Sequence, residues 1–384
     1  FRRVLFRSGC FLSGGIDSAT VVSLLQNQTS NIVNTFTIGF DEAEFDESKQ
    51  AKSIASLLGT NHNEFFVSPK DALATIPKLS SLYDEPFADV SQIPTYILSE
   101  FSSSKVKVCL SGDGGDELFC GYNRHIVGPK IWGFLKYLPF SIRLIISNFI
   151  KSIPPSSWDK FYNYFETYLP KYLKVNSPGL KLQKISDLIN VRSLYEVYLS
   201  LLSSWENPNS IVKDTSFFVD SSKFEFCKNN IKDLHHQIMF MDTIGYLPYD
   251  ILVKIDRAAM SNSLETRLPL LDHRVVEFAW QMPLNMKLRK KTSKWLLRQV
   301  LKKYLPDNLI DGPKRGFSVP ISDWLRGPLK EWANTLLDPS LINSQNYFNV
   351  DPISKKWHQH LSGKHDWSSQ LWTILVFQSW LNEI

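Results

Sequence analysis

Short apolar runs and longer amphipathic stretches alternate through the first third of the chain. The apolar runs predict four strands, over residues 10–12, 32–38, 62–67 and 106–110. Between them, apolar residues three or four positions apart predict helices over residues 19–25, from a cap at Asp46 to Gly59, from Pro69 onward, and over residues 92–101. Strands that alternate with helices in this way predict right-handed crossovers and an α/β fold with a doubly wound parallel sheet.

The pattern changes near Gly128, after which long helical periods, prolines and aromatic residues dominate and little strand signal remains. We therefore expect an α/β core over residues 9–127 and a mainly helical part over residues 128–384. The most apolar window, 142–150, is too short to cross a membrane, and we expect it to form an amphipathic helix buried in the protein. Residues 1–8 crowd three arginines where an apolar strand is expected, and we interpret them as a foreign or truncated start.

Composition narrows the range of partners only slightly. The 384 residues carry 43 lysines and arginines and 38 acidic residues, a net charge of +5, which neither requires nor excludes an acidic partner. No appended basic domain or membrane-spanning segment is visible, so we expect neither a nucleic-acid partner nor a membrane partner. The four cysteines are scattered without a C-x-x-C pair, which favours a reducing cytoplasm over a disulfide framework or a structural zinc site.

The first chemical motif is FLSGGIDS at residues 11–18, between the first predicted strand and the first predicted helix. Its two glycines allow a tight turn, so the helix that follows points unpaired backbone N–H groups at an anion. Ser13 and Ser18 add hydroxyl donors. Asp17 places a carboxylate beside the phosphates, which is favourable only when a divalent cation lies between them. The motif lacks the features of the two common phosphate loops, and an ordinary strand-to-helix turn is the alternative.

The second motif is LSGDGGDELF at residues 110–119, directly after the fourth predicted strand. Its glycines permit close approach of the backbone to a nucleotide. Its carboxylates would repel phosphates unless magnesium intervened, so we expect Asp116 to bind the metal together with Asp17. A calcium loop or a plain acidic turn is the alternative, but the ligand spacing of an EF-hand is absent.

The loop at residues 11–18 resembles the pyrophosphate-binding SGGxDS loop of the ATP pyrophosphatase (PP-loop) family, whose members cut ATP between the α- and β-phosphates. With the second motif added, the chain is similar to the synthetase domain of the glutamine-hydrolysing asparagine synthetase family. Separated motifs follow that family's order over about residues 9–380. The further segments of resemblance are residues 34–40, 84–91, 247–261, 264–272 and 312–320.

The resemblance implies roles for individual residues. Those implied to bind ATP and its pyrophosphate are Leu12, Ser13, Gly14, Gly15, Asp17, Ser18, Ile38, Ser111 and Gly112. Ile38 matches the position that contacts adenine, and Asp17 and Asp116 are implied to hold Mg²⁺. Lys314 matches the lysine that reaches the α-phosphate and stabilises negative charge in the transition state, although a lysine in such a loop is otherwise usually just solvated. Asp113 is implied to lie near the acyl carbon or the incoming amine.

The resemblance also implies an adenine nucleotide α-hydrolase-like fold and ATP-dependent amide synthesis. A carboxylate, aspartate in the family, attacks the α-phosphorus of MgATP, and pyrophosphate leaves. Ammonia then displaces AMP from the acyl-adenylate to give asparagine. Family members carry an N-terminal glutaminase domain that releases ammonia from glutamine. We expect this chain to start after that domain, and a homodimer is one option for its assembly.

Four alternatives stay open. A related enzyme could amidate another carboxylate, such as a sugar acid in surface polysaccharide synthesis. β-Lactam-forming synthetases resemble the chain but place a tyrosine where this sequence has Asp113. A tRNA-modifying ATP pyrophosphatase would predict an appended basic domain and often paired cysteines. A non-enzymatic adaptor would not need intact Asp17, Asp116 and Lys314.

Two groups of charged residues need a separate interpretation. Asp256, Arg257, Glu265 and Arg267 alternate in sign, a pattern that often marks a solvated helix face. Their apolar neighbours indicate partial burial, so a paired network that shapes the site is an interpretation of at least equal weight. The basic run at residues 287–303 could contact phosphate, but we interpret it as a solvated helix face.

Overall fold

The computed structural model describes residues 8–40, 46–154, 157–158, 161–162, 164, 178–205, 207–214, 222–310 and 319–383. The chain forms two compact units. The first comprises Phe1–Gly121, Asn209–Phe218 and Phe240–Ile384, and the second comprises Tyr122–Pro208 and Val219–Met239. Both chemical motifs of the sequence lie in the first unit.

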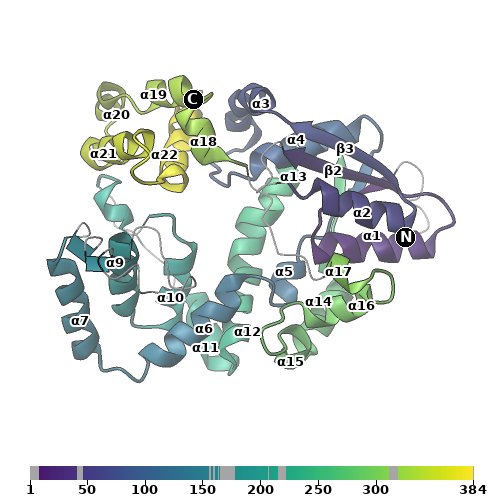
Figure 1. The fold of residues 1–384 in the computed structure, drawn as a ribbon, viewed down its shortest axis with the longest axis horizontal. Coiled ribbons are helices and arrows are strands. Elements are labelled where there is room, and N and C mark those ends of the chain that lie inside the picture. The colour runs from purple at the N-terminus through teal and green to yellow at the C-terminus, as the bar shows by residue number, and fades with distance from the viewer. Residues whose placement is uncertain are drawn as a thin grey trace. The chain divides into compact units, whose positions relative to one another are not determined.

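A five-stranded parallel sheet lies in the first unit, with strand order β3-β2-β1-β4-β5 (Figure 1). The strands are β1 (Ser8–Phe11), β2 (Asn34–Phe40), β3 (Asn61–Val67), β4 (Val108–Leu110) and β5 (Glu265–Arg267). The four strands predicted from the first third of the chain are confirmed, with ends shifted by one or two residues. β5 comes from the second half of the chain, where the pattern predicted little strand. The α/β class with a parallel sheet is confirmed.

Helices connect and follow these strands. Those before residue 121 are α1 (Ile16–Gln28), α2 (Ser48–Leu58), α3 (Pro69–Leu82), α4 (Gln92–Ser103) and α5 (Gly115–Leu118). Those after residue 241 are the π-helix η4 (Asp242–Ile251), α13 (Leu252–Met260), η5 (Pro269–Leu271), α14 (His273–Gln281), α15 (Leu284–Lys287), α16 (Trp295–Leu301), α17 (Asp307–Ile310), α18 (Ile321–Arg326), α19 (Lys330–Leu336), α20 (Pro339–Gln345), α21 (Val350–Leu361) and α22 (Ser368–Leu381). The predicted helical character of the second half is confirmed.

The ends of the early helices follow from local chemistry. α3 begins at Pro69 behind a capping box, in which the Ser68 hydroxyl accepts from the Asp71 N–H and the Asp71 carboxylate accepts from the Ser68 N–H. α2 ends at Gly59, whose φ of +69° suits glycine. α2 begins two residues after the expected cap, although the carboxylate of Asp46 does accept a hydrogen bond from the N–H of Ser48 at 3.0 Å.

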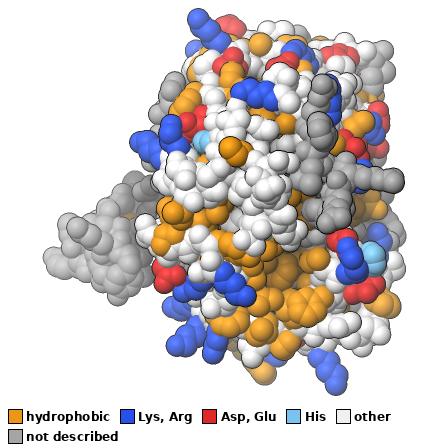
Figure 2. Space-filling view, turned by 90° about the vertical axis from the view of Figure 1, so that its right-hand side faces the viewer, with side chains coloured by type: hydrophobic (Ala, Val, Ile, Leu, Met, Phe, Trp, Pro, Cys, Tyr) orange, Lys and Arg blue, Asp and Glu red, His pale blue; other side chains and the backbone are white. Residues whose placement is uncertain are grey.

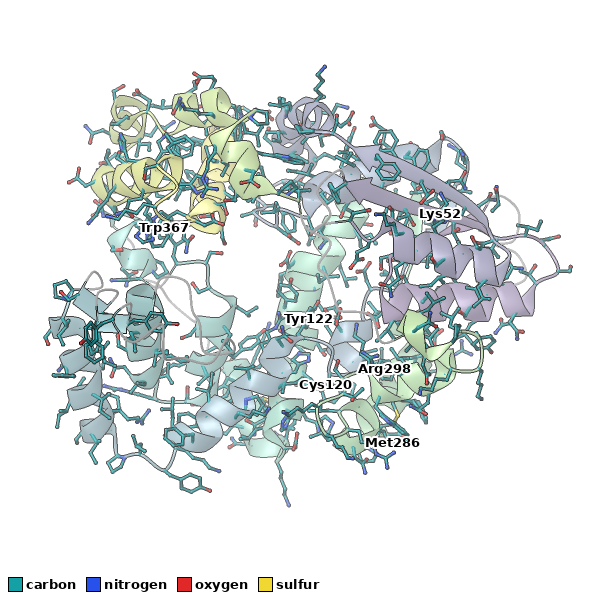
Figure 3. The ribbon with its side chains drawn as sticks, viewed as in Figure 1. Lys52, Cys120, Tyr122, Met286, Arg298 and Trp367 are labelled. Carbon is teal, nitrogen blue, oxygen red and sulfur yellow. The ribbon has the colours of Figure 1, made fainter. Side chains whose placement is uncertain are left out.

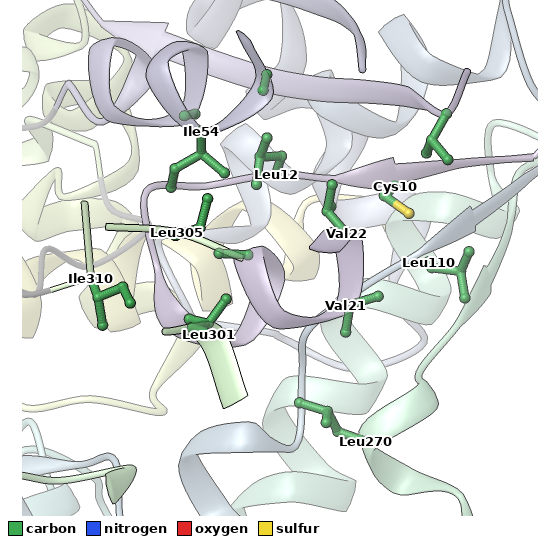
Figure 4. Close-up of a cluster of buried hydrophobic side chains, with 14 residues drawn as sticks. Cys10, Leu12, Val21, Val22, Ile54, Leu110, Leu270, Leu301, Leu305 and Ile310 are labelled. Carbon is green, nitrogen blue, oxygen red and sulfur yellow. The ribbon is translucent and has the colours of Figure 1, made fainter. Parts of the chain in front are cut away.

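One hydrophobic core joins the sheet to α1 and to the region of α16. Figure 4 shows this cluster, in which side chains near residue 300 pack against those of the first fifty residues. The labelled members are Cys10, Leu12, Val21, Val22, Ile54, Leu110, Leu270, Leu301, Leu305 and Ile310. Burying one large aliphatic side chain contributes about 1.5–3 kcal/mol. This core therefore holds the C-terminal end of α16 and the segment after it against α1 and the sheet.

The second unit is helical. It contains α6 (Asn123–Leu135), α7 (Phe140–Ser152), α9 (Pro178–Ile189), α10 (Leu194–Leu202) and α11 (Ser222–Asn230), and α12 (Leu234–Met241) begins in it. α7 contains the apolar window at 142–150, and the expectation that this helix is buried is wrong. Ile145 is 68% exposed and Phe149 is 61% exposed, whereas Arg143 is buried. The apolar face of α7 therefore points outward.

The face shown in Figure 2 carries charged side chains of both signs, and hydrophobic side chains gather in its lower half. This mixture agrees with the small net charge of +5. Among the described residues, no helix combines the length and the apolar character that a bilayer crossing requires.

Candidate active site

The two sequence motifs meet at the carboxyl ends of adjacent strands. β1 and β4 lie side by side in the sheet, with Cys10 opposite Leu110. The first loop follows β1 and the second follows β4, so both leave the sheet at the same edge. In open parallel sheets, ligands bind at this edge, outside the carboxyl ends of the strands. The fold therefore brings both motifs to the region where a ligand is expected.

Two serines order the first loop. The N–H of Ser13 donates to Ser18 Oγ at 3.1 Å, and the N–H of Gly15 donates to Ser13 Oγ at 3.1 Å. The two hydroxyl oxygens lie 3.0 Å apart. α1 begins directly after Gly15 and carries Asp17 in its first turn. The N-terminal end of this 13-residue helix favours negative charge in front of the loop.

Glycines in the second loop permit contact with the first. A Cβ atom added to Gly112 would lie 2.5 Å from the backbone nitrogen of Ser18. A Cβ atom on Gly115 would overlap the side chain of Asp17. These two glycines are therefore required for packing within the protein, because side chains at these positions would force the two loops apart.

Lys294 connects the acidic residues of the two motifs. Its Nζ lies 2.7 Å from Asp116 Oδ1 and also contacts Asp17 Oδ2. The Lys294 backbone has a φ of 54°, and its N–H donates to the carbonyl of Phe119, which fixes the residue at the start of α16. Burial opposes the positive charge, but the two carboxylates outweigh burial and raise the pKa of Lys294. The ammonium group therefore stays charged.

Figure 3 labels Cys120 and Arg298, which belong to the segment after α5 and to α16. Asp116 lies in α5, just before Cys120, and Lys294 lies directly before α16, so the Asp116–Lys294 ion pair joins these two regions. Cys120 has a φ of 60°, so the chain turns sharply where it leaves α5. Arg298 donates to the carbonyls of Ser293 and Ile310, both at 3.0 Å, and so anchors the start of α16.

Sequence reasoning missed Lys294. The prediction that residues 287–303 form a solvated helix face is wrong for Lys287 and Lys294, whose exposed fractions are 0% and 5%. Lys290 and Lys291, in the same run, are exposed as predicted. Lys287 lies between Met286 and Leu288, and Lys294 precedes Trp295, whereas Lys290 and Lys291 stand among basic and polar residues. The run therefore gives only a weak local signal for its buried lysines.

Asp113 is largely buried between two clusters of charge. The hydroxyl of Ser111 donates a 2.6 Å hydrogen bond to Asp113 Oδ2. Burial raises the pKa of Asp113, whereas the Ser111 hydrogen bond and the charges of Lys254 and Lys294 oppose that rise. Asp113 thus interacts with the lysine of each cluster. Asp113 therefore lies between the Asp17–Asp116–Lys294 cluster and a second cluster around Lys254.

The second cluster joins the segment that leads into α4 to α13. Nζ of Lys254 lies 2.8 Å from Asp89 Oδ2 and 2.8 Å from Ser91 Oγ. The Ser91 hydroxyl also donates to Asp89 Oδ2 at 2.7 Å. Burial would raise the pKa of Asp89, but Lys254 outweighs it, so the net effect is a lowered pKa. Asp89 and Ser91 belong to the segment 84–91, which the family resemblance assigns to the substrate side.

Of the other residues predicted to bind nucleotide, Leu12 and Ile38 are buried. Leu12 is 1% exposed, and its carbonyl accepts a hydrogen bond from the hydroxyl of Thr37. Ile38 is buried within β2. Gly14 follows Ser13 in the first loop. Lys314 lies outside the described residues, so its catalytic role stays a prediction, as do the nucleotide contacts of the others.

Three of the four alternating charged residues form ion pairs, and all four are exposed. Arg257 lies 2.5 Å from Asp84, and Arg267 lies 2.5 Å from Glu265. The side chains of Arg257 and Arg267 are 46% and 60% exposed, and Asp256 is exposed as well. The expectation of partial burial is therefore wrong. Ion pairs with this exposure contribute at most about 1 kcal/mol.

Asp17 and Asp116 fit a divalent cation. Both carboxylates contact a single ammonium nitrogen, so they lie close enough to share one cation. Carboxylate oxygens are ligands that Mg²⁺ prefers. In the described part of the chain, no three His, Cys, Asp or Glu side chains gather as a metal site. The protein would therefore supply two ligands, and phosphates of a nucleotide would supply others, as is common for Mg²⁺.

Comparison with known proteins gives a consistent picture. The family model described as asparagine synthase matches residues 6–382. Asparagine synthetase (glutamine-hydrolyzing) 1 of Bacillus subtilis is 30% identical and covers 97% of this chain and 55% of that protein. A putative asparagine synthetase of Mycobacterium bovis is 31% identical over 97% of this chain and 54% of that protein. Amidase chyE of Penicillium rubens is 25% identical over 88% of this chain. The chain spans about half the length of the curated relatives it matches.

Proposed function

We propose, since the chain belongs to the asparagine synthase family, that it uses ATP to activate the side-chain carboxylate of aspartate and joins that carbon to ammonia. One observation carries the proposal: Asp17 in the first turn of α1, Asp116 and Lys294 meet at the carboxyl ends of β1 and β4. A nucleotide triphosphate placed there would meet helix N–H groups, two acids suited to a metal, and a fixed ammonium group.

The proposed reaction has two steps. A carboxylate oxygen of aspartate attacks the α-phosphorus of ATP, and the bond to the oxygen that bridges the α- and β-phosphates breaks, so pyrophosphate leaves with the electron pair. Ammonia then attacks the acyl carbon of the aspartyl-adenylate, the carbon–oxygen bond to AMP breaks, and the nitrogen loses a proton. The products are asparagine, AMP and pyrophosphate.

Different residues of the chain would bind the pyrophosphate and the metal ion. Ser13, Ser18 and the N–H groups at the start of α1 would hold the pyrophosphate. Asp17 and Asp116 would hold Mg²⁺, which when bound neutralises phosphate charge and makes pyrophosphate a better leaving group.

Two further side chains would act at the reacting atoms. Lys314 would stabilise the negative charge that develops at the α-phosphate in the transition state. Asp113 would lie beside the acyl carbon. In the structure Asp113 has the buried position and the raised pKa that often mark a functional acid.

The nitrogen would come from a separate source. The four cysteines all belong to the described residues and all are buried, so none is placed to attack glutamine. The names of the relatives state that those proteins hydrolyse glutamine. We propose that ammonia for this site is released from glutamine by a glutaminase outside residues 1–384.

An isotope experiment tests the proposal. The chain is incubated with MgATP, ammonium chloride and aspartate labelled with ¹⁸O in the side-chain carboxylate. We expect asparagine, pyrophosphate and AMP in equal amounts, with one ¹⁸O atom transferred to the phosphate of AMP. Formation of ADP, or AMP without label, would contradict the adenylate mechanism. Amide formed from a different acid in a parallel panel, and not from aspartate, would contradict the proposed substrate.

A further inference from the structure

The acids around Asp113 outnumber the lysines that face them. Lys254 interacts electrostatically with Asp89, Asp113 and Asp250, so one ammonium group faces three carboxyl groups. The neighbouring Lys294 does not correct this imbalance, because it already pairs with the two acids of the phosphate loops. The region therefore favours the arrival of another positive charge.

Asp250 has an acceptor atom that no protein group satisfies. Its Oδ1 atom is buried, and no hydrogen-bond partner for it exists among the described residues. A buried carboxylate oxygen without a partner costs free energy, so a ligand that donates a hydrogen bond there would recover that cost. The residue also interacts with Asp89, which is already engaged by Lys254.

The backbone that carries Asp250 is unusual. Residues Asp242–Ile251 form the π-helix η4, ten residues long, whereas π-helical geometry ordinarily appears as single turns and often at functional sites. η4 packs against α5, which carries Asp116, and continues directly into α13, which carries Lys254. The π-helix therefore connects the metal-binding acid of the second loop to the Asp89–Lys254 cluster.

We propose that Asp250 is a specificity-determining residue that binds a primary ammonium group beside the reacting carbon, with Asp89 and Asp113 completing its surroundings. This inference rests on the proposed function, because that function puts the substrate carboxylate next to Asp113. An ammonium group offers three donors and one positive charge, which match a free carboxylate oxygen and the local excess of acids. The ammonium group belongs either to the amino-acid substrate or to the incoming nitrogen donor.

The charge of Asp250 makes this recognition depend on pH. Burial raises the pKa of Asp250 to about 6, with Asp89 adding to the rise and Lys254 opposing it. Among the described residues, Tyr246 and Tyr83 also interact with Asp250. Burial, Asp89 and Asp250 raise the pKa of Tyr83, so its hydroxyl stays neutral. Above about pH 6 the carboxylate is charged and binds the cation. Below that pH, affinity for the ammonium group falls.

Calorimetric titration of the wild type and of Asp250→Asn, at about pH 8, tests the assignment without requiring turnover. The probes are aspartate, succinate (which lacks the amino group) and ammonium chloride against sodium chloride. Asp256→Asn is the matched control, because Asp256 is exposed on the neighbouring helix α13. An unchanged response to MgATP in each variant shows that the fold is intact.

We expect Asp250→Asn to weaken one ammonium-bearing probe about tenfold or more, as loss of a charged hydrogen bond predicts, and to leave succinate unchanged. Weaker aspartate binding identifies the substrate's amino group, and weaker ammonium binding identifies the nitrogen donor. The inference is overturned if all probes bind the variant as they bind the wild type, if succinate weakens as much as aspartate, or if the wild type binds no ammonium-bearing probe. If Asp250→Asn weakens aspartate binding but the wild type makes no amide from aspartate, the proposed function alone is overturned.

Discussion

The ammonium nitrogen of Lys294 lies 2.7 Å from Oδ1 of Asp116, although the two residues are far apart in the chain. The same nitrogen contacts Asp17, so one buried cation holds together two acids that would otherwise repel each other. Two carboxylates and one ammonium group leave a net negative charge before any ligand arrives. A metal ion is therefore favourable at this position, whereas phosphate without a metal ion is not.

Replacing Lys294 with methionine should destabilise the protein by about 3 kcal/mol, because two carboxylates that are only 15% and 21% exposed lose their shared counter-ion. Magnesium chloride should restore part of that loss, since Mg²⁺ can take the place of the ammonium charge. Urea unfolding with and without magnesium measures both effects. Lys291→Met, a change at an exposed lysine of the same run, is the control and should leave stability unchanged. Equal stability of the two variants would show that Lys294 does not hold the acids.

Gly112→Ala should disturb the contact between the two loops. The added methyl group would lie 2.5 Å from a backbone nitrogen of the first turn of α1, and backbone cannot move aside cheaply. We expect a loss of about 1–3 kcal/mol of stability, as for other overpacked sites, together with weaker ATP binding. Gly133→Ala is the control, because its methyl group would meet no atom within 4 Å. That change in α6 should be neutral or stabilise by up to about 1 kcal/mol. Similar results for both variants would refute the close approach of the loops.

Asp113→Asn should make the empty protein more stable at about pH 8. Burial raises the folded-state pKa of Asp113 above its unfolded value, so its stabilising form is the protonated one. That contribution is present below the unfolded pKa and is lost as pH rises through the folded pKa. Asparagine has the same shape, still accepts from Ser111 and cannot ionise. Its advantage should be about 1–3 °C in Tm at about pH 8 and should shrink on acidification. If the Tm of Asp113→Asn relative to the wild type instead rose at low pH, the raised pKa of Asp113 would be contradicted.

The chain should use ammonium and ignore glutamine. Burial raises the pKa of Cys10 to about 12 and of Cys227 to about 11, so both thiols stay protonated and unreactive near neutral pH. Cys109 and Cys120 are also buried. The measurement is the amount of asparagine formed from MgATP and aspartate, first with ammonium and then with glutamine as the nitrogen donor. Product from glutamine with purified chain would mean that one of these thiols becomes accessible.

The strands and both loops could be predicted because their signals are local. A buried strand, a glycine turn and the first turn of a helix are all encoded within residues 8–18, and the second motif follows the same plan after β4. Lys294 could not be predicted in this way. Its burial depends on where α16 packs, and α16 is held in place by core contacts made by Leu301 and Leu305 with residues near the N-terminus.

β5 escaped prediction for a similar reason. It is three residues long, and its Glu265 and Arg267 are exposed, so it has neither the length nor the apolar character of a typical strand. It forms because the N–H of Glu265 finds the carbonyl of Lys107 at the open edge of the sheet.

The prediction of a buried apolar face for α7 is wrong because the buried face of this helix is partly polar. The guanidinium of Arg143 donates to the carbonyls of Leu138, Ile189 and Val191 and thereby satisfies three backbone acceptors inside the second unit. Apolar periodicity assigns the inside of a helix to its hydrophobic stripe. A buried arginine that ties three carbonyls together reverses that assignment, and only the tertiary structure shows its partners.

Aspartate-dependent release of pyrophosphate from MgATP shows whether Asp17 and Asp116 form a metal nucleotide site. The assay compares wild type, Asp17→Asn, Asp116→Asn and the exposed control Asp256→Asn, each checked for folding by its unfolding transition. We predict that the first two variants lose at least about a hundredfold in rate and that the control keeps the wild-type rate. Near-normal rates in folded Asp17→Asn or Asp116→Asn protein would contradict the site.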